Sequence, residues 1–469
     1  MIASQELRCA GCGAAPGVDA PYPFRCPNAD SGDGRDHVLG VVGGSGDGDA
    51  PWPPADIGSP QPFVRYRARL WSHALAASRG MADADFVALV EALDAAVARV
   101  DGHGFRVTPF APEDALAMRL GRAPGTVWVK DETRHVAGSH KGRHLFGVAL
   151  ALEVAERTGA AMRAETDRRG LAIASCGNAA LAAAVIARAA RRPLRVFIPD
   201  DADPRVVSRL RALAAQVVIC PRDPGIRGDP CMVAFRAAVR GGALPFCCQG
   251  SENGLTIEGG MTLAWEMADC MRTSGLALDR WFVQVGGGAL ASACAQALRR
   301  ALAHGVLSRL PRLHTVQTEG GWPLRRAWER LRARMLPGFD GDDDVAAARM
   351  AALGTAARDQ ALRHAQDHRA EFMWPWESPP HSQAHGILDD ETYDWLEVSR
   401  GLIESGGWPV TVKESSVREA HVLARGATAI LADATGTAGL AGLMELLARG
   451  QIAQGERLAL LFTGVERSV

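Results

Sequence analysis

From residue 126 onward, short β-rich runs alternate with alanine-rich amphipathic segments. The expected strands cover 126–132, 170–175, 194–199, 215–220, 280–285, 312–318 and 457–463. The expected helices cover 144–157, 178–191, 207–215, 262–273 and 289–302. Regular alternation of strands and helices predicts a mostly parallel sheet with helices on both faces. We therefore expect an α/β fold, interrupted at about 321–420, where the alternation breaks and an insertion or extended subdomain is expected.

Three regions differ in composition. Residues 1–50 hold a Cys-rich segment, and we expect them to form a small zinc-ribbon-like or degenerate ribbon. Residues 51–125 are expected to be a linker followed by a helical part, since 43–62 are rich in Gly, Pro and Asp. Residues 126–469 are expected to be the α/β core. Within the helical part, one stripe of helical spacing comprises Phe86, Leu89, Val90, Leu93, Val97 and Val100.

Charge and hydropathy exclude several classes of protein. The 469 residues carry a formal net charge of -1, which argues against a nucleic-acid binder. No apolar run reaches the ~18 residues that a spanning helix needs, so no membrane partner is expected. The first residues lack a basic segment followed by an apolar one, so we expect a cytoplasmic protein. The ten cysteines are then expected to be reduced.

Cys9 and Cys12 form a Cys-x2-Cys pair of the kind that turns two thiolates onto one metal ion. Cys26 is the candidate third ligand, and no fourth cysteine lies nearby. A zinc ion held by four protein ligands here would be structural, and a metal-free ribbon is the alternative. The candidates for the fourth ligand are His37, Asp30 and Asp36.

Lysine is scarce: the chain contains only Lys130, Lys141 and Lys413. Lys141 follows an expected strand and a Gly-Ser-His turn, and it opens an expected helix. Unpaired N–H groups at a helix start disfavour a positive charge, which favours the neutral amine that imine formation needs. A P-loop does not match this segment. Lys141 is therefore a candidate Schiff-base lysine, whereas a solvated surface lysine is the alternative.

The run Ser175-Cys176-Gly177-Asn178 follows a second expected strand. Gly177 permits a tight turn, and Asn178 is expected to cap the next helix. Such a turn can hold a ligand carboxylate on its N–H groups while the Asn side chain donates to a ligand oxygen. A plain cap is the alternative. Cys176 lacks an evident partner histidine, so we do not expect it to be a nucleophile.

Two further turns follow expected strands near the C-terminal half. Gly286, Gly287, Gly288 and Ala289 lie between a hydrophobic strand and a helix, where successive N–H groups form a nest for a phosphate. The sequence lacks G-x-G-x-x-G, which disfavours a dinucleotide. A tight turn is the alternative. Thr463 ends the last strand, and alone it indicates only a turn.

Taken in order, these four segments resemble the tryptophan-synthase-β-like family of pyridoxal-phosphate enzymes, fold type II. The resemblance covers roughly 105–320 and 410–469, and it implies two three-layer α/β subdomains and a homodimer. It implies that Lys141 holds pyridoxal phosphate as an imine, with His140 beside it, and that Asn178 faces the cofactor's phenolic oxygen. The glycine turn would hold the phosphate, and Thr463 would face the pyridine nitrogen. The implied substrate-binding residues are Ser175, Cys176, Gly177 and Arg143.

Within this family, the Cys-x2-Cys segment and the chain length look most like threonine synthase. Two residues depart from that pattern, because His140 and Gly142 stand where Phe and Asp are usual. We expect elimination or replacement at the β or γ carbon of a small amino acid, with a serine/threonine ammonia-lyase or a cysteine-synthase-like enzyme as alternatives. A cofactor-binding regulatory protein is the non-enzyme alternative. Within the expected insertion, the residues that could reach a site are Glu377, His381 and His385.

Overall fold

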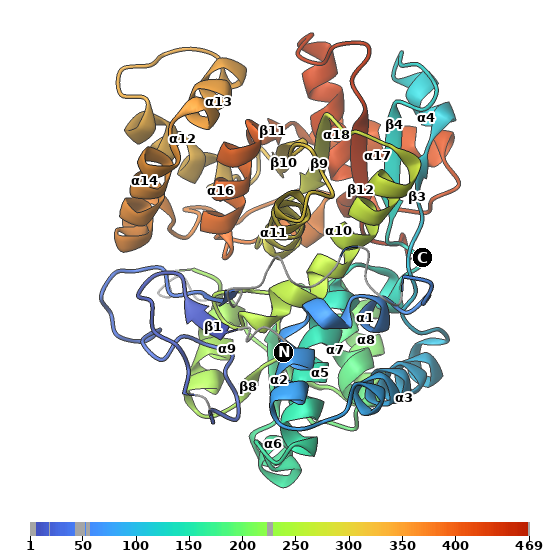
Figure 1. Cartoon of the computed structure of the whole chain (residues 1–469), viewed down its shortest axis with the longest axis vertical. Helices are drawn as coiled ribbons and strands as arrows, with labels where there is room; N and C mark the ends of the chain where they lie inside the picture. Colours follow the sequence, from blue (N-terminus) through green and yellow to red (C-terminus); the bar gives the residue numbers. More distant parts are fainter. Residues whose placement is uncertain (1–5, 18, 43–51, 53–56, 223–227, 468–469) are drawn as a thin grey trace. The chain divides into compact units, whose positions relative to one another are not determined.

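The computed structural model describes residues 6–17, 19–42, 52, 57–222 and 228–467. The chain divides into two compact units, which are described in turn (Figure 1). Most of the predicted linker at 43–62 lies outside the described residues. Unit 1 comprises residues 1–32, 37–107 and 135–262, and unit 2 comprises 33–36, 108–134 and 263–469.

Unit 1 contains a four-stranded, fully parallel sheet with the strand order β7-β6-β5-β8. Its strands are β5 (Leu171–Ala174), β6 (Leu194–Ile198), β7 (Gln216–Ile219) and β8 (Leu244–Pro245). All four residues of β5 are buried, because a central parallel strand is covered on both faces. Helices connect successive strands, which is the arrangement that the alternating sequence pattern predicts.

The helices of unit 1 surround a largely apolar interior. Helix α3 buries the predicted stripe at Phe86, Leu89, Val90, Leu93 and Val97, whereas Val100 is only half-buried. It ends at Gly102, whose φ of 91° is the left-handed conformation that glycine adopts at helix ends. The helices are α1 (Pro62–Arg65), α2 (Trp71–Ser78), α3 (Asp83–Asp101), α5 (Lys141–Arg157), α6 (Arg163–Arg169), α7 (Asn178–Ala189), α8 (Pro204–Ala212), α9 (Pro230–Arg240) and α10 (Leu255–Ser274). In α10, residues 255–262 belong to unit 1 and residues 263–274 belong to unit 2.

A two-stranded antiparallel ribbon precedes these helices. It pairs β1 (Glu6–Cys9) with β2 (Leu39–Val42), and Cys9 lies opposite Leu39. Cys9, Cys26 and Leu39 form a small buried cluster of their own. This confirms the expected ribbon at the N-terminal end of the chain.

Unit 2 contains a six-stranded sheet with the strand order β11-β10-β9-β12-β4-β3. All neighbouring pairs are parallel except β3 and β4, which are antiparallel. The strands are β3 (Phe110–Pro112), β4 (Val127–Asp131), β9 (Arg280–Gln284), β10 (Arg312–Thr318), β11 (Val410–Val412) and β12 (Leu458–Phe462). Two mostly parallel sheets therefore confirm the predicted α/β fold class.

The stretch 321–420 is mainly helical and returns to the sheet as its edge strand β11. Helix α18 lies against β9, β10 and β12, and helix α16 lies against β10. The helices of unit 2 are α4 (Asp114–Arg119), α11 (Ala289–Ala303), α12 (Pro323–Met335), α13 (Asp343–Ala352), α14 (Thr355–Asp367), α15 (Arg369–Phe372), α16 (Trp395–Ser405), α17 (Glu414–Ala427) and α18 (Ala434–Ala448). Short 3-10 turns are η1 (Arg67–Arg69) and η2 (Val136–Gly138) in unit 1, and η3 (His385–Ile387) in unit 2.

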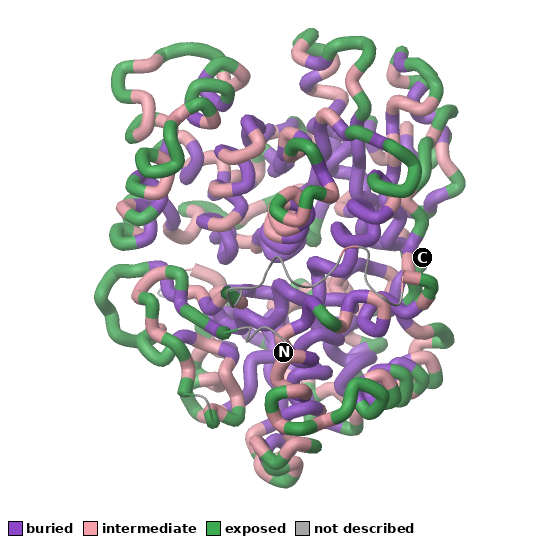
Figure 2. Tube along the Cα trace, in the orientation of Figure 1, coloured by how far each residue is buried: buried purple, intermediate pink, exposed green. Residues whose placement is uncertain are grey.

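Burial follows the sheets. In Figure 2 the central strands are purple, and the exposed residues gather on loops and on the outer sides of helices. None of the helices in the described ranges has an apolar stretch long enough to cross a bilayer.

Candidate functional site

Lys141 is the first residue of α5, as the sequence predicts. The chain reaches it through a tight turn in which Ala137 and Gly138 have φ values of 56° and 67°. Ser139 then adopts an extended conformation and is fully buried. Its Oγ atom has no hydrogen-bond partner among the described residues. A buried hydroxyl of this kind is usually satisfied, so a ligand that bonds Ser139 would remove a cost of about 1–3 kcal/mol.

The other two lysines have different surroundings. Lys130 is fully buried in unit 2, where its Nζ atom donates to Glu266 at 2.5 Å and to the Thr108 carbonyl at 2.8 Å. Lys413 is exposed and precedes α17. Lys130 thus serves a buried ion pair, and Lys413 is a surface residue. Lys141 is the half-buried lysine at a helix start.

The turn between β5 and α7 places Ser175, Cys176 and Gly177 directly before a helix of twelve residues. Cys176 is exposed, and the Oγ atom of Ser175 accepts from the Gly177 N–H at 3.4 Å. The expectation that Asn178 caps α7 is wrong by one residue. Gly177 occupies the cap, and Asn178 is the first helical residue. With no side chain, Gly177 leaves the first N–H groups of α7 without a side-chain cap.

Arg143 and His140 are more enclosed than their predicted roles suggest. Arg143 is fully buried, and its Nη1 atom donates to Thr262 at 3.0 Å. His140 is also buried, with its ring centroid 5.8 Å from that of His144 in an edge-to-face arrangement. Arg143 lies in the first turn of α5, and His140 is the N-cap of that helix. Their predicted contacts with substrate and cofactor stay predictions.

In unit 2, Gly286, Gly287 and Gly288 lead from β9 into α11, as predicted. Gly288 is the N-cap of α11 with a φ of 94°, a conformation that favours glycine. The first N–H groups of the fifteen-residue helix α11 have no acceptor within the helix, which makes this end a suitable place for an anion.

Sequence reasoning missed the segment that covers this glycine turn. The Thr392 hydroxyl donates to the Gly286 carbonyl at 3.0 Å, and the Asp394 N–H donates to the Gly287 carbonyl at 2.9 Å. A Cβ at Gly288 would lie 2.9 Å from the Thr392 methyl carbon, and one at Gly286 would collide with the Asp389 carboxylate. The glycines are therefore required by this packing, and a carboxylate lies beside the turn. The local sequence 389–394 carries no signal of this contact.

Thr463 follows β12 and is almost fully buried. Its Oγ1 atom accepts a hydrogen bond of 2.5 Å from the Nε2 atom of Gln284, the last residue of β9. Gln284 also donates to the carbonyls of Gly436 and Leu461. Sequence reasoning missed Gln284, although a polar residue directly after the hydrophobic run 281–283 was a signal that could have identified it.

The three residues singled out in the expected insertion lie on the surface. His381 and His385 are exposed. Glu377 accepts from Arg326 at 3.0 Å and from the Trp374 ring N–H at 2.6 Å. These hydrogen bonds, with the Trp374 bond the largest cause, lower the pKa of the Glu377 carboxyl.

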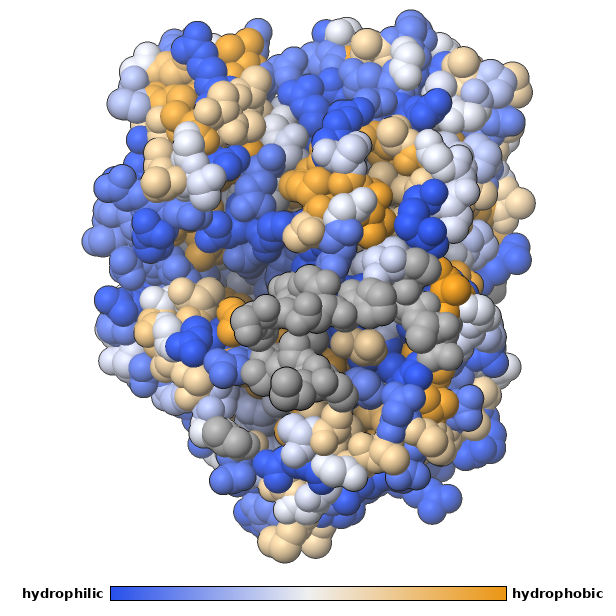
Figure 3. All heavy atoms as spheres, in the orientation of Figure 1, coloured by the Kyte–Doolittle hydropathy of each residue, from blue (hydrophilic) through white to orange (hydrophobic). Residues whose placement is uncertain are grey.

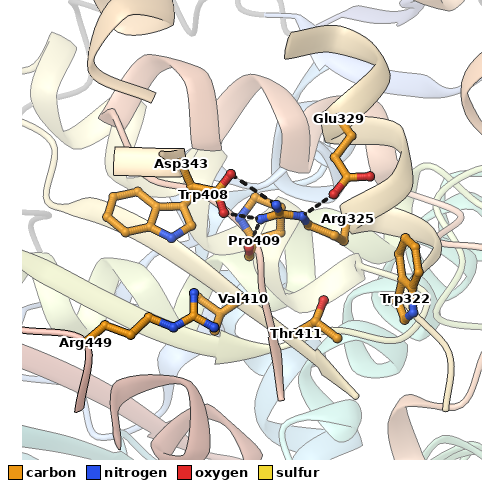
Figure 4. A pocket seen from close by; sticks show the side chains of 9 residues that line it. All are labelled: Trp322, Arg325, Glu329, Asp343, Trp408, Pro409, Val410, Thr411 and Arg449. Atoms are coloured by element: carbon orange, nitrogen blue, oxygen red, sulfur yellow. Dashed lines mark hydrogen bonds and ion pairs between the residues drawn. The ribbon is translucent and has the colours of Figure 1, made fainter. Parts of the chain in front are cut away.

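A pocket of about 310 Å³ in unit 2 opens beside β11 and contains none of the predicted site residues (Figure 4). Its Arg325 donates to Asp343 at 2.6 Å and to Glu329 at 2.8 Å. Because its guanidinium is already paired with two carboxylates, Arg325 is poorly suited to hold a further anion.

The N-terminal cysteines come together as predicted, and the structure identifies their fourth partner. The Nδ1 atom of His37 lies 3.6 Å from the Cys9 sulfur and 3.5 Å from the Cys26 sulfur. The Cys12 and Cys26 sulfurs are 3.5 Å apart, and all four ligand atoms lie within 4.8 Å of one another. Of the alternatives, Asp30 is bonded to Arg25, and Asp36 is bonded to Arg369. Three sulfurs and one imidazole nitrogen are a donor set that suits tetrahedral zinc.

Comparison with known proteins places these turns in context. The family model described as pyridoxal-phosphate dependent enzyme matches residues 103–464. The chain belongs to this family. A relative named cysteate synthase, from Methanoregula boonei (strain DSM 21154 / JCM 14090 / 6A8), is 26% identical over 297 residues, which are 62% of this chain and 60% of the relative. The match therefore spans less than two thirds of that relative's length.

Solved structures share the fold. A threonine deaminase from T.th. is 23% identical with a TM-score of 0.55, and the match covers 81% of this chain and 98% of that one. The diaminopropionate ammonia lyase from Escherichia coli is 15% identical with a TM-score of 0.56, over 81% of this chain and 88% of that one. At these identities the likeness concerns the fold alone.

The residues present fit the cofactor that the family implies. Unit 1 offers an amine at a helix start, next to a buried hydroxyl that lacks a partner among the described residues. Unit 2 offers a glycine turn at a helix start and a buried threonine hydroxyl at a strand end. An amine suits an aldehyde, helix N–H groups suit a phosphate, and a hydroxyl suits a ring nitrogen.

Proposed function

We propose that this protein catalyses elimination or replacement at the β or γ carbon of a small amino acid, with pyridoxal phosphate as cofactor. The observation that carries the proposal is the setting of Lys141. Among the three lysines, only Lys141 begins a helix next to a hydroxyl, that of Ser139, for which the described part of the chain offers no hydrogen-bond partner. Its position falls within the segment matched by the family model.

When bound, pyridoxal phosphate supplies an electron sink for negative charge at the substrate's α carbon. Lys141 would hold the cofactor through its Nζ atom, and the same atom, when free, would take the proton from the substrate's α carbon. Asn178 would donate to the cofactor's phenolic oxygen. The N–H groups of the turn Ser175–Gly177 would orient the substrate carboxylate.

The unit 2 residues would have two tasks. The turn Gly286–Gly288 and the start of α11 would bind the phosphate. Thr463 would present a neutral hydroxyl, rather than a carboxylate, to the ring nitrogen. A hydroxyl leaves that nitrogen largely unprotonated, which weakens the electron sink. This favours loss of a leaving group from the β or γ carbon over transamination.

Among the possible reactions, we favour a threonine-synthase-like one. The Cys9-Cys12-Cys26-His37 cluster supports it, because this segment is the part of the chain that looks most like threonine synthase. The relative named cysteate synthase also supports a replacement reaction, whereas the two ammonia-releasing enzymes of similar fold support elimination as the second candidate. His140 and Gly142 depart from the threonine synthase pattern. We therefore do not assume that the substrate is a phosphorylated homoserine.

We further propose that the cysteine cluster holds a structural zinc ion. Its four protein ligands would leave no open position for catalysis. Our proposals of a homodimer and of a cytoplasmic location rest on the sequence reasoning and the family resemblance.

A substrate panel tests the reaction. The purified protein with added pyridoxal phosphate is incubated with serine, threonine and their O-phospho and O-acetyl esters, with and without sulfide or sulfite. Release of phosphate or acetate together with a new amino acid supports replacement, and release of a keto acid supports elimination. Turnover of no amino acid by the cofactor-loaded protein would favour the regulatory alternative.

A further inference from the structure

A second group of metal-ligand side chains lies outside both sites described above. His364 and His368 are one turn apart at the end of α14, and Glu371 follows in α15. Histidines four residues apart project from the same side of a helix, and such pairs recur as metal ligands. His364 is half-buried, whereas His368 and Glu371 are exposed. Unit 2 thus carries two imidazoles and a carboxylate on its surface.

Ligand atoms of the three side chains lie close together. One ligand atom from each of the three side chains can be chosen so that all lie within 4.8 Å of one another. The His364 Nε2 atom lies 3.8 Å from the Glu371 Oε2 atom, and the two imidazole centroids are 4.1 Å apart. Two ligands at about 2.0–2.2 Å from a tetrahedral ion are roughly 3.4 Å apart, so small side-chain rotations would bring these atoms to bonding distance.

The hydrogen bond that His368 makes through one ring nitrogen also suits the other ring nitrogen to bind a metal ion. Its Nδ1 atom lies 2.9 Å from the His364 carbonyl oxygen, which can only accept a hydrogen bond. In the neutral ring, Nδ1 therefore carries the proton and Nε2 keeps its lone pair. Metal-binding histidines typically donate their other ring N–H to a carbonyl or carboxylate in this way. His368 and Glu371 are exposed, so solvent can reach both side chains. Figure 3 shows hydrophilic residues over much of the face in view.

We propose that His364, His368 and Glu371 bind a divalent transition-metal ion of the zinc class, with water in the remaining positions. Two imidazole nitrogens and one carboxylate oxygen suit zinc, cobalt or nickel, whereas magnesium and calcium prefer oxygen ligands alone. The site differs from the cysteine cluster in lacking sulfur and in being open.

The metal would stabilise the junction between α14 and α15. His368 is the cap residue shared by the two helices, so an ion held by His364 and Glu371 would join one helix to the other. The junction also carries Arg369, which forms ion pairs with Asp36 and Glu391. Glu391 immediately precedes Thr392, whose hydroxyl bonds the glycine turn at Gly286. The site therefore lies on the helical support of the segment that covers this turn.

Cobalt titration of the full-length protein tests the site and separates it from the cysteine cluster. Cobalt bound to thiolates absorbs intensely in the near ultraviolet, whereas cobalt bound to imidazole and carboxylate does not. Beyond the metal ion in its cysteine cluster, whether retained zinc or added cobalt, we expect wild-type protein to bind one further equivalent of cobalt or zinc without added near-ultraviolet absorbance. This further ion is counted as the second equivalent. In His368→Ala and in Glu371→Gln, the affinity for this second equivalent should fall at least tenfold.

His381→Ala is the matched control, because His381 is an exposed histidine outside the group. The control should bind both equivalents as wild type does. Added zinc should raise the Tm of the control by a few degrees more than it raises the Tm of His368→Ala. Glu371→Gln changes an exposed side chain with little change in shape, so it keeps the test valid if His368→Ala folds poorly. Equal binding of the second equivalent by wild type and both site variants, or no second equivalent in wild type, would overturn the proposal.

Discussion

The Nε2 atom of Gln284 donates a 2.5 Å hydrogen bond to the Oγ1 atom of Thr463. Gln284 is the last residue of β9, and Thr463 directly follows β12, the parallel strand beside β9. Because a hydroxyl carries only one hydrogen, accepting from Gln284 leaves that hydrogen to be donated in another direction. Gln284 thus orients Thr463 as a donor, which is the role that an unprotonated ring nitrogen requires. We regard Gln284 as a positioning residue for the proposed cofactor.

Gln284→Glu should weaken cofactor binding about tenfold, because it replaces the N–H donor by an acceptor and draws the Thr463 hydrogen toward itself. Fluorescence titration with pyridoxal phosphate measures the affinity, and the absorbance of the bound cofactor as a function of pH reports on its ring nitrogen. Thr463→Ser, which keeps the hydroxyl, is the control and should retain both properties. If Gln284→Glu binds and titrates as wild type does, Gln284 has no such role.

The glycine turn allows a test in which only charge differs. Gly287→Asp places an anion where the phosphate is proposed to bind, and Gly287→Asn adds a side chain of nearly the same size without the charge. Both variants crowd Tyr393, since a Cβ at Gly287 would lie 3.0 Å from a Tyr393 ring carbon. We expect the Asp variant to bind pyridoxal phosphate at least tenfold more weakly than the Asn variant. Equal affinities would argue against phosphate binding at this turn.

The cysteine cluster should retain one zinc ion per chain through purification without chelators. His37→Ala removes the only nitrogen ligand of the group Cys9-Cys12-Cys26-His37, and it should lower the zinc content below half an equivalent. Atomic absorption measures the metal. Asp30→Asn is the control, because Asp30 is bonded to Arg25, and it should retain zinc. Loss of zinc from Asp30→Asn but not from His37→Ala would show that the fourth ligand is misassigned.

Asp433 should make stability depend on pH in a defined window. Burial raises the pKa of its carboxyl to about 6, although it accepts from the Gly436 N–H at 2.6 Å. The folded state therefore holds a proton that the unfolded state has lost between pH ~4 and ~6, and this carboxyl costs stability as the pH rises through that window. The full cost, at most about 3 kcal/mol, is present above pH 6.

Asp433→Asn keeps an acceptor at the start of α18 and removes the titration. The Tm of the variant minus the Tm of wild type should increase as the pH increases from 4 to 7. Thermal unfolding followed by circular dichroism at several pH values measures it. A difference that is constant over this range would mean that Asp433 titrates normally.

Local sequence patterns were sufficient for much of this fold. All seven predicted strands are present, because they are short, rich in hydrophobic residues and, for the most part, buried. The strands that were missed, β3, β8 and β11, are two or three residues long, which is too short for a periodic pattern. Asn178 was misplaced by one residue, because a glycine can occupy a cap without any side-chain signal.

Local sequence patterns could not predict contacts between residues that are far apart in the sequence. The packing of Thr392 and Asp394 on the glycine turn joins residues about a hundred positions apart, and neither side of this contact has a periodic signature. The choice of His37 over Asp30 and Asp36 also depended on tertiary structure, since both aspartates proved to be paired with arginines. The residue types in the sequence were enough to name the candidate ligands, but only the fold showed which candidate lies beside the cysteines.

The central claim is that Lys141 carries the cofactor, and a covalent trapping experiment tests it most directly. Protein incubated with pyridoxal phosphate is reduced with borohydride and digested, and the modified peptide is identified by mass spectrometry. We predict a single phosphopyridoxyl group on Lys141, and none on Lys130, which is held in a buried ion pair with Glu266. A modification found on Lys130 or Lys413, or on no lysine at all, would contradict the account.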